Sequence, residues 1–278
     1  MSFDLIKDLR ERTGAGIMDC KAALASSGND LEKAIDFLRK KGVAQAAKRA
    51  GRQAKEGLVW SRVEGNRAVI VEVNSETDFV ARTDEFRNLT TLAANETLAH
   101  GESAIKSPKI TQAVTELSGK IGEKIVVRRA KIIQARGGAL FTYIHSNHKL
   151  GVVVEIASAG AQAAREAGFH ELGKNIAMQV AAANPLCLKR SEVPPGVLER
   201  EKAIFREEVK GKPENIIEKI VQGKLEKFYA TNCLLEQPFI KDDKLSVQAL
   251  LDGAGKKWGS AVEVRQFVRF EVGETVTA

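Results

Sequence analysis

The sequence has few cysteines, few aromatic residues and no long hydrophobic run. Its three cysteines, Cys20, Cys187 and Cys233, lie far apart and include no CxxC pair, which fits reduced thiols and argues against a disulfide framework or a zinc site. No apolar stretch is long enough to span a bilayer, and the first residues contain acids but no signal-peptide segment. These absences predict a cytoplasmic protein without a membrane anchor.

Residues that would form a catalytic or metal site are also missing. The four histidines form no HxxxH or HExxH pair, and no serine, cysteine or lysine lies in a nucleophile motif. Two glycines precede a helix in TGAGIMDCK, residues 13–21, but this stretch lacks the preceding strand and the Lys-Ser or Lys-Thr of a phosphate-binding loop. We therefore expect no cofactor, no metal, no direct nucleotide binding and no chemical catalysis.

The composition is that of a folded, basic protein. Hydrophobic residues make up 44% and charged residues 28% of the 278 residues, close to the average for globular proteins. The net charge of +7 would suit nucleic acid or an acidic partner. One basic stretch, residues 39–55, has few aromatic residues that could stack on bases, which favours a solvated linker. Association with RNA or the ribosome stays open as an alternative function.

Residues 1–42 show three apolar stripes at helical spacing, which predict a three-helix module. Asn29 with Glu32 resembles a capping box, and Gly42 suits the left-handed position that ends a helix. Residues 43–56 are basic and rich in alanine, and they predict a partly helical linker.

An internal repeat divides the rest of the chain. The segment AVIVEV reappears as GVVVEI, with a shift of 83 residues from Val69 to Val152 (152 − 69 = 83). The same shift relates further pairs: Trp60 and Tyr143, Glu72 and Glu155, Ser75 and Ser158, Arg82 and Arg165, Phe86 and Phe169, Leu89 and Leu172, and Ala94 and Ala177. The sequence therefore predicts two related subdomains, at residues 57–139 and 140–278.

Each half has the pattern of a strand hairpin, a helix and a later strand. This pattern predicts an α+β fold with a three-stranded antiparallel sheet in each half. The late strands are expected at 124–133 and 264–272. The second half is longer because residues 194–229 carry two helical patterns separated by the turn GKP, which predict an inserted antiparallel helical hairpin.

The segment VEVNSETDFVAR, residues 71–82, begins with the end of a strand. The strand pattern then stops, and Asp78 and Phe79 lie at the expected start of a helix. Under the 83-residue shift these two residues correspond to Ala161 and Gln162, so the shared scaffold does not require an acid and a ring there. Two interpretations stay open. Phe79 could extend the buried stripe of Phe86, two helical turns later, or it could be an exposed wedge for a groove in another protein.

Several motifs together resemble bacterial elongation factor Ts, in order and over nearly the whole chain: LRERTGAGIMDCKAAL, EVNSETDFVAR, IGEKIVVRR, IAMQVAAANP, GKPENIIEKIVQGKLEKF and RFEVGE. This resemblance implies a guanine-nucleotide exchange factor for elongation factor Tu that acts by protein–protein binding. It also implies a ubiquitin-associated-like N-terminal module, two related core subdomains and an inserted helical hairpin.

The resemblance further implies which residues contact the partner. The segment that would enter between helices of the partner's GTPase domain, and disturb its magnesium and phosphate site, consists of Thr77, Asp78, Phe79 and Val80. Contacts from the N-terminal module would come from Arg10, Ile17 and Met18, and the turn near His145 would face another domain of the partner. Partner contact or homodimerisation through the hairpin stays open. The C-terminal helical tail of some family members is not expected, because the sequence ends soon after RFEVGE.

Overall fold

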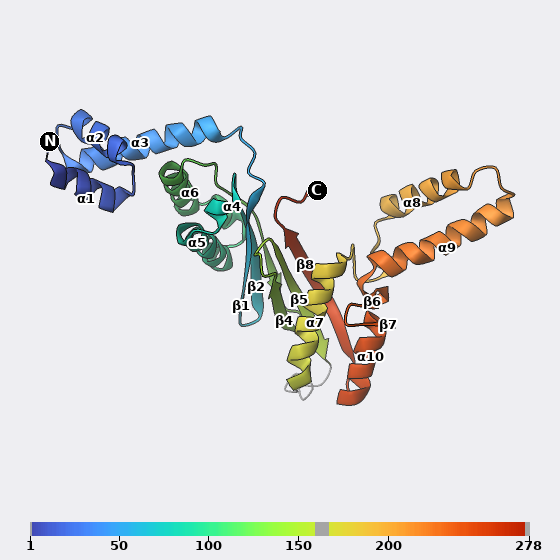
Figure 1. Cartoon of the computed structure of the whole chain (residues 1–278). Coiled ribbons are helices and arrows are strands. Elements are labelled where there is room, and N and C mark those ends of the chain that lie inside the picture. Colours follow the sequence, from blue (N-terminus) through green and yellow to red (C-terminus); the bar gives the residue numbers. More distant parts are fainter. Residues whose placement is uncertain (1, 159–166, 276–278) are drawn as a thin grey trace.

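The computed structural model describes residues 2–158 and 167–275. A small helical module lies at one end of the elongated molecule, two sheets with their helices form its centre, and a helical hairpin projects at the other end (Figure 1). The antiparallel sheets and flanking helices confirm the predicted α+β fold. Within the described ranges, no helix is both long and apolar enough to cross a membrane.

The N-terminal module has the three predicted helices, α1 (Phe3–Thr13), α2 (Ile17–Ser26) and α3 (Leu31–Arg49). They pack around a small apolar core that includes Leu9 and Leu24, both fully buried. The predicted capping box of Asn29 and Glu32 is wrong. The N-cap of α3 is Asp30, whose carboxylate accepts a hydrogen bond from the backbone N–H of Lys33, because Asn29 has a left-handed φ of 65° and still belongs to the turn.

The prediction that the third helix ends at Gly42 is wrong, because α3 continues to Arg49. Its C-terminal half packs on α6 (Pro108–Ile121), where a Cβ added to Gly119 would lie 3.7 Å from the Cα of Gly42. Gly42 therefore lies inside α3, beside α6, and does not end the helix. Residues 43–49 of the predicted linker are helical, and only residues 50–55 are irregular.

The first half forms a sheet of strand order β1-β2-β3, made of β1 (Glu56–Glu64), β2 (Arg67–Ser75) and β3 (Val126–Gln134). As predicted, β1 and β2 form an antiparallel hairpin with Gly65 in the turn, at a φ of 59°. The helical elements of this half are α4 (Asp78–Ala81), α5 (Asp84–His100), the 3-10 helix η1 (Glu102–Lys106) and α6. Phe86, Leu89 and Ala93 of α5 lie in the core, as the periodicity predicts.

The second half repeats this arrangement. Its sheet has the order β4-β5-β8, with β4 (Ala139–Ile144), β5 (Leu150–Ser158) and β8 (Val262–Glu271), and its outer helices are α7 (Ala167–Ala183) and α10 (Val247–Trp258). The α7 residues Phe169, Leu172 and Ile176 lie in the core. Both predicted late strands are confirmed. Ala161, Gln162 and Arg165, the expected counterparts of Asp78, Phe79 and Arg82, lie outside the described residues.

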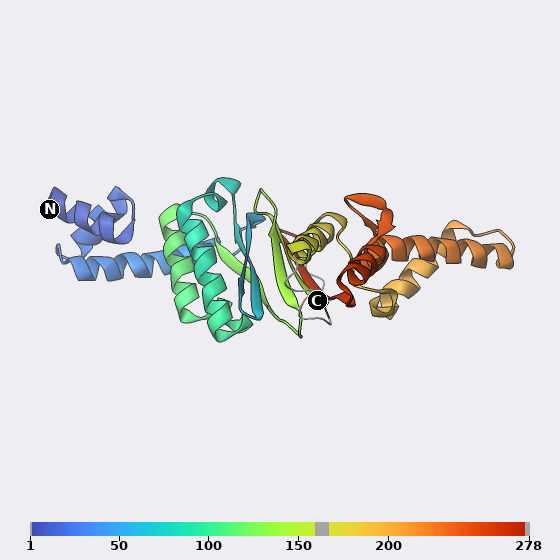
Figure 2. The ribbon, with the colours of Figure 1, turned by 90° about the horizontal axis from the view of Figure 1, so that it is seen from below.

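The inner faces of the two sheets pack against each other, which gives four layers in the order helices, sheet, sheet, helices (Figure 2). The shared core contains Val59 and Ile70 from the first sheet and Val153 from the second. Gly151 permits this close approach, because a Cβ there would lie 2.6 Å from Cγ1 of Val59. The backbone N–H of Val59 also donates to the carbonyl of His148 at 2.7 Å. The two halves therefore share one core.

The predicted insert is confirmed as two helices, α8 (Pro195–Glu208) and α9 (Glu214–Asn232). At its base, Val193, Cys187 and Cys233 form a small cluster in which both cysteines are free thiols, with sulfurs 3.8 Å apart. The remaining elements of this region are η3 (Arg190–Glu192), η4 (Leu234–Glu236), β6 (Pro238–Phe239) and β7 (Asp242–Ser246).

Candidate partner-binding site

Asp78 and Phe79 form a corner between β2 and α5. The chain leaves β2 at Ser75, makes the single turn of α4, and enters α5 at its N-cap Thr83, whose hydroxyl accepts from the backbone N–H of Phe86. The Phe79 side chain is 77% exposed, whereas Phe86 is fully buried. The interpretation of Phe79 as part of the core stripe is therefore wrong, and its ring is presented to solvent.

The residues after Phe79 anchor this corner. Val80 and Ala81 are buried in the apolar core of the first half, together with Phe86. Burial of a valine side chain contributes about 1.5 kcal/mol or more, which fixes α4 on the sheet. The partner contact of Val80 stays a prediction, but in this structure its side chain supports the turn that carries Phe79.

The carboxylate of Asp78 has a cationic neighbour. Its Oδ2 lies 2.6 Å from the guanidinium of Arg82, whose side chain is 74% exposed. An ion pair in such a solvated position contributes at most about 1 kcal/mol. Asp78 can therefore exchange Arg82 for a polar group of a partner at small cost.

Glu123, a residue outside the VEVNSETDFVAR segment, also contacts the corner. Its carboxylate accepts hydrogen bonds from the backbone and the hydroxyl of Thr77. Sequence reasoning missed this residue because it is 46 positions away from Thr77. The only signal was its place in the motif IGEKIVVRR, directly after Gly122, which ends α6, and this motif does not indicate a contact with Thr77.

Arg10, Ile17 and Met18 lie on the N-terminal module, where Ile17 and Met18 open α2 and are 54% and 74% exposed. Arg10 is exposed near the end of α1, which Gly14 ends in a left-handed conformation. Gly16 is the N-cap of α2. Gly14 and Gly16 therefore lie in a turn between two helices. This agrees with the sequence, which lacks the preceding strand and the Lys-Ser or Lys-Thr of a phosphate-binding loop.

His145 lies in the turn between β4 and β5 and is exposed. Its Nδ1 is 3.0 Å from the hydroxyl of Tyr143, so the ring orientation is set by a neighbour on β4. The predicted contact residues thus occupy three separate places in the fold: the corner at α4, the start of α2 with the end of α1, and the β4–β5 turn.

Several cations of the basic stretch, residues 39–55, bind other residues of this chain. Three of its cations have these partners: Lys41 pairs with Asp19 at 2.7 Å, Arg49 donates to the carbonyl of Ser118 at 3.2 Å, and Arg52 pairs with Glu76 at 3.2 Å. The last two join the end of α3 to the first half. Nucleic-acid binding through this stretch would need free cations for phosphate groups, so these contacts weaken that alternative.

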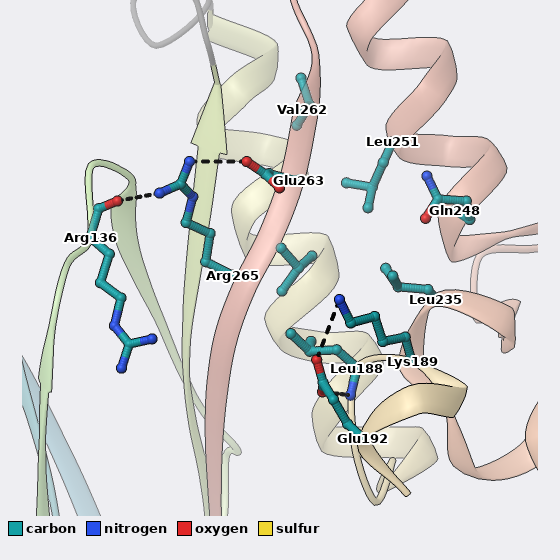
Figure 3. A pocket seen from close by; sticks show the side chains of 11 residues that line it. Arg136, Leu188, Lys189, Glu192, Leu235, Gln248, Leu251, Val262, Glu263 and Arg265 are labelled. Carbon is teal, nitrogen blue, oxygen red and sulfur yellow. Dashed lines mark hydrogen bonds and ion pairs between the residues drawn. The ribbon is translucent and has the colours of Figure 1, made fainter.

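Within residues 2–158 and 167–275, no group of three or more His, Cys, Asp or Glu side chains could hold a metal ion. A pocket of about 530 Å³ lies between β8, α10 and the segment around η3 (Figure 3). Four of its five charged side chains form two ion pairs, Arg265 with Glu263 at 3.0 Å and Lys189 with Glu192 at 4.0 Å. The residues predicted to contact a partner are not among those that line it. The corner at Phe79 is therefore the better candidate for a functional site.

Comparison with known proteins gives one consistent result. Residues 76–274 match the model of the family described as Elongation factor TS. A protein named elongation factor Ts from Prosthecochloris aestuarii is 44% identical over 284 residues, which cover 96% of this chain and 97% of the relative. Elongation factor Ts from Brucella ovis is 44% identical over 290 residues, 99% of this chain and 94% of the relative. The protein of the same name from Brucella suis gives the same values.

Proposed function

Because this chain belongs to the elongation factor Ts family, and is therefore a translation elongation factor, we propose that it binds elongation factor Tu and accelerates the release of GDP from it. The observation that carries the proposal is the exposed ring of Phe79, 77% exposed, on a turn anchored by buried Val80. A large apolar ring held in solvent on a fixed turn is suited to a groove in another protein.

The proposed mechanism needs no chemistry on this chain. An exchange factor lowers the affinity for a nucleotide when it binds the nucleotide-free partner more tightly than the nucleotide-bound partner, and this coupling is reciprocal. Burial of the Phe79 ring in a partner would contribute about 1.5–3 kcal/mol. Each 1.4 kcal/mol changes an equilibrium constant about tenfold, so one ring that fits only the nucleotide-free form supplies a substantial part of the coupling.

The remaining contacts of the proposal surround this wedge. The carboxylate of Asp78 would compete for polar groups near the magnesium and phosphate site of the partner. Arg10, Ile17 and Met18 would bind the partner from the N-terminal module, and the turn at His145 would bind a second domain. The hairpin of α8 and α9 carries the exposed side chains Ile204 and Ile216, which supports a contact with the partner or with a second copy of this chain. The same proposal implies a cytoplasmic location.

Stopped-flow release of labelled GDP from elongation factor Tu tests this function. The native protein should accelerate release in a saturable manner, and Phe79→Ala should lower the rate at saturation about tenfold or more. Phe3→Ala is a matched control, because Phe3 is 79% exposed but lies on α1. It should leave the rate at saturation unchanged. Unchanged GDP release in the presence of the native protein would refute the proposal, and RNA affinity with a steep salt dependence would favour the nucleic-acid alternative.

A further inference from the structure

The backbone that leads into the corner is bound by a carboxylate from another part of the chain. Glu123 follows α6 and is half-buried. Its Oε2 accepts from the backbone N–H groups of Glu76, at 3.1 Å, and of Thr77, at 3.0 Å, and its Oε1 accepts from the hydroxyl of Thr77 at 2.7 Å. One carboxylate thus receives three hydrogen bonds from the two residues immediately before Asp78.

The two segments bind each other reciprocally. While Glu123 accepts from the backbone of Glu76, the Oε1 of Glu76 accepts from the backbone N–H of Lys124 at 2.6 Å. The carbonyl of Glu123 is itself held by the hydroxyl of Ser118 at 2.5 Å. Each segment therefore uses an acid to bind the other's backbone, and we call Glu76, Thr77, Glu123 and Lys124 the reciprocal clamp.

Helix α4 needs such support because it cannot stabilise itself. It has only four residues, and a single helical turn is not stable in isolation. Its N-cap Thr77 makes no capping hydrogen bond from its side chain, since its hydroxyl donates to Glu123. The orientation of Phe79 is therefore set from two sides, by the burial of Val80 after it and by the clamp before it.

The irregular segment that follows α3 is attached to the same clamp. The Nζ of Lys124 donates to the carbonyls of Ala50, at 2.6 Å, and Arg52, at 2.8 Å. The guanidinium of Arg52 in turn donates to Glu76 at 3.2 Å. The linker that follows the N-terminal module and the corner thus meet at the same four residues.

We propose that Glu123 is a positioning residue for nucleotide exchange, which holds Thr77 so that the exposed ring of Phe79 is preoriented for the partner. The inference rests on the proposed function and adds to it a residue that lies outside the corner. A corner that had lost the clamp would have to be ordered after the other surfaces have bound, as Phe79 enters the partner and the nucleotide leaves, and ordering one residue has an entropic cost that corresponds to about a tenfold change in rate.

Glu123→Ala and Glu123→Gln test the kinetic part. Glu123→Ala removes all three hydrogen bonds and should lower the saturated rate of GDP release about tenfold, with little change in the concentration for half-maximal rate, because the other proposed contact surfaces are intact. Glu123→Gln keeps one acceptor oxygen and should restore part of the rate. Glu116→Ala is the matched control, because Glu116 is exposed on α6 and bonds only its neighbour Gln112 among the described residues. Rates are compared per folded molecule.

A spin label attached to Phe79→Cys tests the positioning directly, without a partner. The three native cysteines are buried, so the label should react at position 79. We expect the label to have low mobility in the Phe79→Cys protein with Glu123 intact and high mobility when Glu123→Ala is added. With Glu123→Gln its mobility should be intermediate. Unchanged label mobility, or altered mobility with unchanged exchange, would overturn the inference. If the native protein accelerates no GDP release at all, the proposed function fails, and the label still reports whether the clamp orders the corner.

Discussion

Glu72 and Glu155 are fully buried, lie 83 residues apart, and each immediately precedes a register shift in its strand pairing. The two sheets thus share the position of this register shift as well as the order of their strands. The donors differ between the two sites. Glu72 is paired with the cations of Arg128 and Arg129, at 2.9 and 2.6 Å, whereas Glu155 accepts from neutral groups, which are the backbone N–H groups of Arg136 and Gly138 and the side chain of Gln266.

Glu72→Gln should therefore destabilise the protein more than Glu155→Gln. The first substitution removes the carboxylate partner of Arg128 and leaves Arg129 paired with Glu274, and it should lower the free energy of unfolding by about 3 kcal/mol. The second replaces a carboxylate by a neutral acceptor and should lower it by about 1 kcal/mol. Urea unfolding measures both values. Equal losses would show that the charge of Glu72 contributes nothing beyond its hydrogen bonds.

The stability of the protein should decrease in acid. Burial acts to raise the pKa of Glu72, but the hydrogen bonds from Gly273, Asn74 and Arg128 and the charge of Arg129 outweigh it and hold this pKa below its ordinary value of 4.5. A carboxylate with a lowered pKa adds stability that is present above the unfolded-state value and is lost as the pH falls through the folded-state value. The free energy of unfolding should therefore decline below pH 4.5.

The control for this pH dependence is the Glu72→Gln variant, in which the decline should be shallower. A residual decline is expected, because a hydrogen bond from the backbone N–H of Lys124 lowers the pKa of Glu76 in the same direction. Identical pH profiles for the native protein and the variant would contradict the assignment to Glu72.

Phe79 and Phe86 provide a matched pair of rings for a test of stability. Phe86→Ala removes a fully buried ring and should lower the free energy of unfolding by about 3–5 kcal/mol. Phe79→Ala removes an exposed ring and should change it by about 0.5 kcal/mol or less. Thermal unfolding compares the two. A large drop in the melting temperature for Phe79→Ala would mean that this ring packs in solution.

Gly42→Ala should stabilise the N-terminal module. Gly42 is helical and a Cβ there would meet no neighbour within 4 Å, so alanine should gain about 1 kcal/mol from its higher helix propensity. Gly28→Ala is the control, because Gly28 has the same open surroundings but a φ of 62°. It should destabilise the module by about 1 kcal/mol. Amide hydrogen exchange in α1, α2 and α3 distinguishes the two outcomes.

The outer part of the helical hairpin should be dispensable for folding. Replacement of residues 199–222 by a short Gly/Ser loop should preserve one cooperative unfolding transition. Replacement of residues 194–229 should preserve it too, but at a lower midpoint, because it removes Phe228 and Tyr229 from the cluster at the base and Glu226 from its 2.6 Å pair with Arg190. Loss of cooperativity in the shorter replacement would show that the hairpin tip belongs to the core.

The sequence was most informative where a pattern is local or repeated. Apolar runs and the 83-residue shift predict the central strands, because β2 and β5 are buried on both faces in the four-layer fold. The additional helices α6 and α10 were missed, although both begin at a capping serine, Ser107 or Ser246, and end at a left-handed glycine, Gly122 or Gly259. Both helices are also amphipathic, so the sequence held the signals that predict them.

Other features could not be predicted from local pattern. A glycine near the end of a periodic segment can end a helix or lie inside a longer one, and only the packing of the C-terminal half of α3 on α6 decides that Gly42 does the latter. The exposure of Phe79 depends on tertiary packing in the same way, since its spacing from Phe86 also fits a core residue. The contact of Glu123 with Thr77 joins residues 46 positions apart.

If the proposed contacts at Phe79 and His145 form, the shared core between the two sheets makes the central part of the molecule a preassembled bivalent ligand. The corner at Phe79 and the turn at His145 belong to different halves, but one packed interior fixes the distance and angle between them, and packed interiors do not deform continuously. Once one of these surfaces is bound, the other faces its target at a high effective concentration, without a further loss of rotational freedom. In the proposed complex, stiffness between the two halves would thus contribute to affinity in addition to the side chains at the surface.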